Sequence, residues 1–313
     1  MIVCCGEALI DMIPAKCGET GEAGFIPRAG GSVFNTSVAL GRLGAEPRFL
    51  SCLSTDMFGA TLERSLRESK VNLDLCLWAN RPTTMAYVRL TQGNASYVFH
   101  DENTAGRMIA LDDLKPFPEE ATTLFFGGIS LVVEPCAETY AALAEREGAN
   151  RVVMVDPNIR PEFIVDEDRF RSRLDRIFKM ANIVKVSDED LEWLAPGELS
   201  ILERAEVILD KGPEIVLVTA GGAGVTAYLG DGRVINKSIT PKDVVDTVGA
   251  GDSFNAGFLR SLQSDGVLEH FSLTNLSENQ IYKALTLGAT VAGVVVSRIG
   301  ANPPWAEELE NAS

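Results

Sequence analysis

Short apolar runs and longer amphipathic segments follow one another along most of the chain. The apolar runs predict buried strands at 2–5, 49–53, 123–126, 152–155, 183–186 and 215–219. The amphipathic segments predict helices at 58–69, 136–146, 170–180, 199–209, 253–264 and 281–296. Strands that alternate with helices are typical of a largely parallel sheet covered by helices, so we predict an α/β fold.

Two segments depart from this pattern. Residues 84–91 and 96–101 alternate between apolar and polar positions around Gln92-Gly93-Asn94, which predicts a β-hairpin. Residues 13–28 carry several glycines and lack a helical period. No simple linker separates these segments from the rest, and we therefore predict a single domain over residues 1–313.

The most specific motif is the stretch 246–252, DTVGAGD, which runs into the helical pattern that follows it. A glycine turn at a helix N-terminus exposes backbone N–H groups where the helix dipole favours an anion such as phosphate. A carboxylate at the same place, Asp252, suits a base that takes the proton from a hydroxyl attacking a phosphoryl group. The alternative is that Asp252 only caps the helix.

A second glycine pair, Gly30-Gly31, precedes a segment whose apolar residues at 33, 34, 38, 39 and 43 share one helical face. Glycine allows close approach of a ligand to the backbone. Asn35 falls in the first turn of this helix, where its amide can donate to and accept from a hydroxylated ligand. Without further support, a capping or surface role for Asn35 is the simpler interpretation.

Composition narrows the class of protein. Hydrophobic residues make up 46% of the chain, enough for a packed core, and the net charge of −16 argues against binding to nucleic acid or an anionic membrane. The six cysteines have no zinc-binding spacing and suit small buried side chains in a reducing compartment, with Cys4 and Cys5 on opposite faces of one strand. The N-terminus does not resemble a signal peptide, and the apolar run 285–296 is too short to span a bilayer, so we expect a cytoplasmic protein.

Two common nucleotide-binding motifs are missing. The chain has no Gly-x-x-x-x-Gly-Lys-Ser/Thr sequence, which disfavours a P-loop kinase. Gly222-Ala223-Gly224 lacks the third glycine of a dinucleotide fingerprint and is followed by strand-like 225–229, which disfavours a nicotinamide-dependent enzyme. These glycines are better explained as a turn between strands.

The motifs together resemble the ribokinase-like carbohydrate kinases, also called the phosphofructokinase-B family. The resemblance covers nearly the whole chain and is carried by residues 6–11, 30–35, 156–160, 219–224, 246–252 and 297–301. It implies a mostly parallel central sheet with helices on both faces, plus a small β-sheet lid formed by about 13–28 and 84–101. The sequence Asp156-Pro157-Asn158-Ile159-Arg160-Pro161 is most similar to the fructokinase branch.

The resemblance implies an ATP-dependent transfer of the γ-phosphoryl group to a sugar hydroxyl. Asp252 would be the base, and the amides of Gly249, Ala250 and Gly251 would stabilise the transferring group. The sugar would contact Asp11, Gly30, Gly31, Asn35, Asn158 and Arg160. The nucleotide would contact Lys185, Ser187, Thr219, Gly221, Gly222, Gly224, Gly249 and Gly251. On residue type alone, Asp11 could equally be a solvated acid and Arg160 a surface ion pair.

The resemblance also implies metal ions. The family usually has an Asn-x-x-Glu motif near the magnesium ion, whereas this chain has Ser187 and Asp190 at the matching positions. Asp190 could still order water around Mg²⁺, although helix capping by Ser187 is the ordinary alternative. Asp246, Val248 and Ser297 match the family's site for a monovalent cation, which predicts activation by K⁺.

We therefore expect a fructokinase, acting on a small-molecule sugar and ATP. A 2-dehydro-3-deoxygluconokinase or a ribokinase of the same fold remains open, and Arg89 and Arg107 are the residues that would favour an acidic sugar. A non-catalytic sugar-binding regulator is disfavoured by the intact Asp252 motif. The hairpin carries Met85, Tyr87, Tyr97 and Phe99, apolar side chains that need cover, so we also predict a homodimer formed through the lid.

Overall fold

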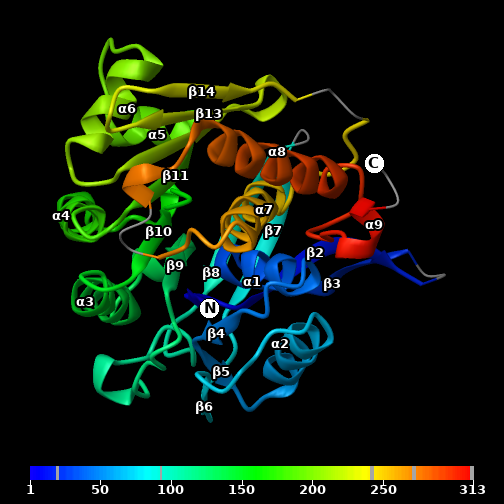
Figure 1. The fold of residues 1–313 in the computed structure, drawn as a ribbon. Coiled ribbons are helices and arrows are strands. Elements are labelled where there is room, and N and C mark those ends of the chain that lie inside the picture. The colour runs from blue at the N-terminus through cyan, green and yellow to red at the C-terminus, as the bar shows by residue number, and fades with distance from the viewer. Residues whose placement is uncertain (19–20, 92–93, 240–242, 270–272, 311–313) are drawn as a thin grey trace.

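A computed structural model describes residues 1–18, 21–91, 94–239, 243–269 and 273–310. Its centre is an eight-stranded sheet in the order β14-β13-β12-β11-β10-β9-β1-β4 (Figure 1). The strands are β1 (Ile2–Cys5), β4 (Arg48–Leu50), β9 (Thr123–Gly127), β10 (Val152–Asp156), β11 (Ile183–Ser187), β12 (Ile215–Thr219), β13 (Val225–Leu229) and β14 (Val234–Lys237). All neighbours from β4 to β12 pair in parallel, and β13 and β14 add antiparallel strands at one edge.

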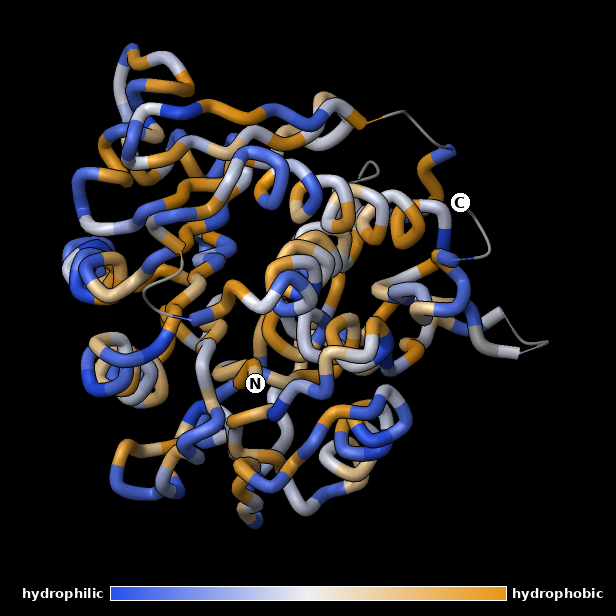
Figure 2. Tube along the Cα trace, viewed as in Figure 1, coloured by the Kyte–Doolittle hydropathy of each residue, from blue (hydrophilic) through white to orange (hydrophobic). Residues whose placement is uncertain are grey.

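Helices cover both faces of this sheet. One face packs against α1 (Ser32–Arg42), α2 (Met57–Glu68), α7 (Ala250–Ser264) and α8 (Glu278–Val295). The other face packs against α3 (Cys136–Glu147), α4 (Glu167–Phe178), α5 (Asp188–Leu194) and α6 (Ile201–Leu209). Figure 2 shows that α3 and α4 are hydrophilic on the outside and more hydrophobic toward the strands. The predicted α/β class and the helices on both faces are confirmed.

Each strand feeds both cores because side chains alternate across a sheet. Cys4 packs in the core under α1 and α7, and its neighbour Cys5 packs in the core under α3 and α4. In the same way, Ile215 packs in the core with Cys4, and Val216 packs in the core with Cys5. Every cysteine whose side chain the structure describes is buried and free, whereas the side chain of Cys17 lies outside the described residues.

A smaller sheet has the order β3-β2-β7-β8. Its strands are β2 (Leu9–Cys17), β3 (Glu22–Gly30), β7 (Met85–Thr91) and β8 (Asn94–His100). The two hairpins β2–β3 and β7–β8 are antiparallel and join through parallel pairing of β2 with β7. The first hairpin begins four residues before the predicted 13–28 segment (Leu9 against residue 13) and runs directly into α1. Residues 92–93 of the predicted turn lie outside the described residues.

One predicted strand is wrong. Residues 49–53 form two short strands instead, with β4 in the central sheet and β5 (Cys52–Ser54) paired with β6 (Leu77–Ala79). The chain changes sheets at Ser51, and because both halves are buried the apolar run gives no sign of the break. The described helices include none that is both long enough and apolar enough to cross a membrane.

Candidate active site

A cleft of about 500 Å³ opens where the parallel strands end at their carboxyl side. Open α/β sheets bind ligands at this edge. Residues that follow β9, β10, β11 and β12 line it, together with α1, β8 and the turn before α7. Its lining comprises Glu7, Leu9, Asp11, Gly31, Ser32, Asn35, Tyr97, Phe99, Gly128, Ile129, Asp156, Asn158, Arg160, Phe163, Lys185, Ser187, Asp188, Glu189, Asp190, Thr219, Gly221, Thr247, Val248, Gly249, Gly251 and Asp252.

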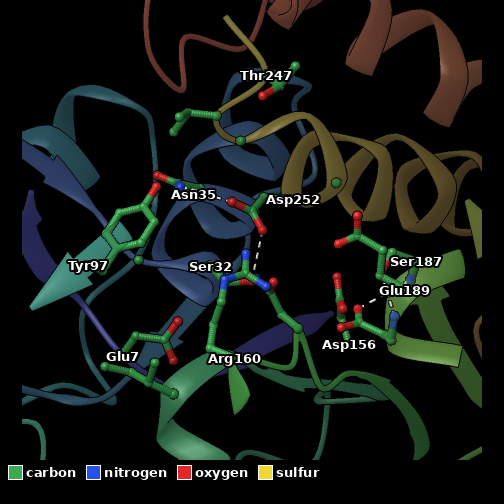
Figure 3. Close-up of a pocket in the computed structure, with 18 of the residues that line it drawn as sticks. Glu7, Ser32, Asn35, Tyr97, Asp156, Arg160, Ser187, Glu189, Thr247 and Asp252 are labelled. Carbon is green, nitrogen blue, oxygen red and sulfur yellow. Dashed lines mark hydrogen bonds between the residues drawn. The ribbon is translucent and has the colours of Figure 1, made fainter. Parts of the chain in front are cut away.

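Asp252 is held by two donors from the first turn of α1 (Figure 3). Ser32 Oγ donates to Oδ1 at 2.8 Å, and Asn35 Nδ2 donates to Oδ2 at 2.9 Å. Burial raises the pKa of Asp252 to about 6, although these two hydrogen bonds favour its ionised form and pull in the opposite direction. Asp252 does not cap its own helix α7, so the capping alternative is wrong.

Asp11 is the second carboxylate of the cleft. Its pKa is raised to about 7, first by burial and then by the negative charge of Asp252. A Cβ on Gly30, which is opposite Leu9 in the β2–β3 register, would come within 2.1 Å of Asp11 Oδ2. Gly30 therefore makes room for this carboxylate rather than lining the cleft itself.

A buried ion pair lies beneath the glycine turn. Lys185 Nζ lies 3.0 Å from Asp156 Oδ2, and Asn255 Nδ2 donates to the same oxygen at 2.7 Å. Burial alone would lower the pKa of Lys185, but the charge of Asp156, the hydrogen bond to it and the charges of Asp190 and Asp252 together outweigh burial, and the pKa is raised. Asp156 Oδ1 is buried with no hydrogen-bond partner in the described part of the chain. The ammonium group is thus fixed as a permanent positive charge in the cleft.

The glycine turn is shaped by contacts on both sides. Gly249 has φ +77°, and a Cβ there would come within 2.5 Å of Ala301 Cβ. A Cβ on Gly251 would come within 2.9 Å of Lys185 Nζ. Asp246 holds the turn from outside the cleft, since its carboxylate accepts from Val248 N at 3.0 Å and from Gly300 N at 2.8 Å.

Ser187 and Asp190 form a capping box at the start of α5. Ser187 Oγ accepts from Asp190 N at 3.0 Å, and Asp190 Oδ2 accepts from Ser187 N at 3.3 Å. Asp190 Oδ1 also accepts from Ile159 N at 3.0 Å. The capping alternative for Ser187 is therefore realised, and Asp190 also fixes the loop that carries Asn158 and Arg160. Within the residues that the structure describes, no group of acidic, histidine or cysteine side chains is arranged to hold a metal ion by itself.

Arg160 and three aromatic rings, those of Tyr97, Phe99 and Phe163, also border the cleft. Figure 3 shows Arg160 extending into the cleft, where its Nη1 donates to Ile159 O at 2.8 Å. Within the part of the chain that the structure describes, Arg160 forms no surface ion pair, and its side chain faces the cleft instead. Tyr97 and Phe99 come from β8, and the Phe99 ring lies 4.4 Å from the ring of Phe163.

The cleft brings together most of the predicted site residues, from both ends of the chain. The predicted residues outside its lining are Gly30, Gly222, Gly224, Ala250, Asp246 and Ser297. Gly224, with φ +107°, closes the turn into β13, which confirms the predicted strand-to-strand turn. Arg107, considered for an acidic sugar, lies outside this lining and pairs with Asp101 at 2.9 Å, and the Arg89 side chain lies outside the described residues.

Sequence reasoning missed several lining residues. Glu7, Ser32 and Asp156 lie inside the stretches that carry the family resemblance, and this is the signal that could identify them. Phe163 and Ile129 carried no signal, because only the fold places them at the cleft.

Comparison with known proteins places this arrangement in a family. The model of the pfkB family of carbohydrate kinases matches residues 1–308. A fructokinase of Rhizobium leguminosarum bv. trifolii is 45% identical over 284 residues, which cover 90% of this chain and 85% of that protein. A fructokinase of Salmonella typhimurium is 32% identical over 271 residues, 84% of each chain. The crystal structure of fructokinase with bound ATP from Xylella fastidiosa matches with a TM-score of 0.89 at 26% identity, covering 100% of this chain and 99% of that one. The chain belongs to the pfkB family of carbohydrate kinases.

Proposed function

We propose that this protein is an ATP-dependent fructokinase that uses Asp252 as the general base. One observation supports this most directly: a buried carboxylate, held by two donors, begins a long helix directly after a glycine turn. The 45% identity to a named fructokinase over most of the chain supports the choice of sugar.

In the proposed reaction, the sugar hydroxyl donates its proton to Asp252 as its oxygen attacks the γ-phosphorus of ATP, the bond from that phosphorus to the β,γ-bridging oxygen breaks, and ADP leaves. A carboxylate with a pKa of about 6 is ionised at neutral pH, yet is a stronger base than an ordinary aspartate. Ser32 and Asn35 keep both its oxygens in place before the sugar arrives. Asp11 would accept hydrogen bonds from sugar hydroxyls, and Asn158 and Arg160 would contact the sugar from the β10 side.

The glycine turn is suited to the phosphoryl group that is transferred. The first amides of a helix have no partner within the helix, and those of Gly249 and Gly251 lie at the start of the 15-residue α7, whereas that of Ala250 donates to Thr247 O at 3.2 Å. Lys185, fixed beneath Gly251, adds positive charge to the same place. Thr219 and Gly221, at the end of β12, would contact the nucleotide.

The cleft also suits the metal ions that accompany ATP. Asp190 has both oxygens engaged by backbone amides, which fits a role through metal-bound water better than direct ligation. The unpartnered Asp156 Oδ1 leaves a buried acceptor for such a water. Bound Mg²⁺ would neutralise charge on the phosphates.

For potassium, Asp246 brings a negative charge to the junction of the glycine turn with residues 297–301. Potassium would thus order the turn from outside the cleft. We expect kcat/KM to be about fivefold or more higher in potassium than in tetramethylammonium. Equal values in the two salts would count against the cation site.

The small sheet would act as the lid and as a dimer interface. Side chains alternate along a strand, so Val98 faces away from the cleft that Tyr97 and Phe99 line. On that outer face Phe25 is 45% exposed and packs edge-on against Tyr87. A hydrophobic sheet face of this kind needs cover, which a second lid would supply. Light scattering at tens of micromolar should give the mass of a dimer, and a monomer would contradict this proposal.

A panel of sugars with ATP, read by coupled detection of ADP, tests the function. D-fructose should exceed D-ribose and 2-dehydro-3-deoxygluconate in kcat/KM. A better rate with the acidic sugar would overturn the choice of sugar but not the kinase. Sugar binding by calorimetry with no ADP formed from any sugar would instead indicate a non-catalytic regulator.

A further inference from the structure

Glu7 is a buried carboxylate of the cleft to which the proposed reaction assigns no role. It follows β1, is 8% exposed and lines the cleft (Figure 3). Its Oε1 accepts from Val33 N at 3.3 Å, and its Oε2 accepts from Ser130 N at 3.3 Å. Val33 lies in the first turn of α1, and Ser130 lies in the turn η2 (Gly128–Leu131) that follows β9.

The surrounding backbone is adapted to this carboxylate. Gly128 has φ +65°, and a Cβ there would come within 2.1 Å of Glu7 Oε1. Gly31 has φ +109°, and its Cβ would come within 3.2 Å of Glu7 Cγ. Burial raises the pKa of Glu7, and the amides of Val33 and Ser130 partly offset this. Such a costly group would be expected to do more than fill space.

The contacts of Glu7 lead directly to the base. Val33 directly follows Ser32, whose hydroxyl donates to Asp252. Asn35, whose amide also donates to Asp252, lies on the same helix. Helix α1 has no side-chain cap of its own, so Glu7 supplies the acceptor at its N-terminus. A shift of this first turn would move both donors away from the carboxylate of Asp252.

We propose that Glu7 is a positioning residue for phosphoryl transfer, which ties the first turn of α1 to η2 and thereby fixes Ser32 and Asn35 against Asp252. This rests on the proposed function only where Asp252 is called the base. The effect of Glu7 on the hydrogen bonds of Asp252 exists in the protein without substrates, so it can be measured without turnover.

The variant Glu7→Gln tests the geometry because both partners of Glu7 are N–H donors. A glutamine has one acceptor oxygen, so its NH₂ group must face one of the two amides. We expect kcat to fall about tenfold or more, with KM for ATP within about threefold, because misplacement of a reacting group acts mainly on kcat.

The pH dependence of kcat distinguishes an effect of Glu7 on the donors Ser32 and Asn35 from an effect of its negative charge. Loss of the donors Ser32 and Asn35 would raise the pKa of Asp252, so the acid limb of kcat should move to higher pH. Removal of a negative charge alone would lower that pKa and move the limb the other way. Glu7→Gln leaves in place the other charges that face Asp252, which are Asp11, Asp156, Arg160 and Lys185. A limb that stays in place or moves to lower pH overturns the proposal.

If Glu7→Gln folds poorly, two further variants can test the proposal in its place. Glu7→Asp keeps the charge but is too short to reach both amides, so full recovery of kcat would overturn positioning. Gly128→Ala leaves Glu7 intact but occupies its site, and should shift the limb in the same direction as Glu7→Gln.

A matched control is Asp56→Asn, which removes a carboxylate that accepts from Phe58 N and Gly59 N at the start of α2, outside the cleft lining. It should lower the melting temperature without moving the limb. The titration of Asp252, followed by carbon NMR in aspartate-labelled protein and assigned with Asp252→Asn, is the readout that needs no turnover. Its pKa should rise in Glu7→Gln. An unchanged or lower value overturns the proposal, whereas a wild type inactive on every sugar overturns only the proposed function.

Discussion

The two sides of the cleft are built by different means. On the carboxylate side, which comprises Glu7, Asp11, Asp156 and Asp252, the chemistry lies in side chains that the fold wholly or partly buries, and specific donors hold Glu7, Asp156 and Asp252. On the glycine side, which comprises 219–222 and 247–249, it lies in backbone turns, and Gly221, Gly222, Thr247 and Val248 are exposed.

This difference has an energetic meaning. Buried carboxylates that must stay ionised destabilise the folded protein, and the raised pKa values of Asp11 and Asp252 show that burial outweighs the favourable contacts. Exposed glycine turns carry no such penalty. Substitution of Asp11 or Asp252 should therefore impair function while stabilising the fold, and the glycine side should tolerate substitution where the turn has free space.

The largest expected effect is that of Asp252→Asn. The isosteric change keeps the contacts with Ser32 and Asn35 largely possible but removes the base, so kcat should fall about 10²–10⁴-fold. Sugar affinity, measured by calorimetry, should stay within a few-fold. Asp210→Asn, at an exposed position after α6, is the control and should change neither quantity. A near-normal kcat in Asp252→Asn would place the base elsewhere.

Two glycine substitutions test the difference between the two sides of the cleft. Gly251→Ala would push its new methyl against Lys185 Nζ, and we expect kcat to fall about tenfold or more because the charge beneath the turn is displaced. A Cβ on Gly222 would meet nothing within 4 Å among the residues that the structure describes, and Gly222 has no unusual φ. Gly222→Ala should leave kcat and the melting temperature unchanged, with at most a small rise in KM for ATP. Equal effects in the two variants would remove the distinction between the sides.

The sequence predicted the central sheet well because its strands are buried on both faces and therefore read as short apolar runs. The glycine turn before α7 could also be identified, because Gly249 has φ +77° and neither Gly249 nor Gly251 has room for a Cβ, so the turn requires glycine at both positions. The same logic failed at 49–53, where the chain enters another sheet without any change in hydrophobicity. It also gave no sign that Ser32 holds Asp252 from 220 positions away in the chain, because that contact exists only once α1 and α7 pack.

Asp11→Ala tests the sugar-facing part of the carboxylate side. A hydrogen bond to a charged group is worth roughly 1.5–3 kcal/mol, so kcat/KM for fructose should fall at least about tenfold. KM for ATP should stay nearly constant, since Asp11 lies on β2, away from the glycine side. A parallel rise in KM for ATP would show that the variant disturbs the whole cleft rather than the sugar contacts.

The smallest effect is one of stability, and its sign distinguishes the two sides. The pKa of Asp11 rises from 3.8 to about 7 on folding, so folding favours the protonated form. Its stabilising contribution is complete below pH 3.8, declines as the pH rises, and is lost above about pH 7. Asp11→Asn removes this penalty, and its melting temperature should exceed that of the wild type by about 2–4 °C at pH 8, which allows for partial exposure of the group. The gap should shrink steadily toward pH 4, while Asp210→Asn should show no gap at any pH. A melting temperature at pH 8 equal to or below that of the wild type would mean that Asp11 is solvated, and that the cleft does not bury its charge before the sugar arrives.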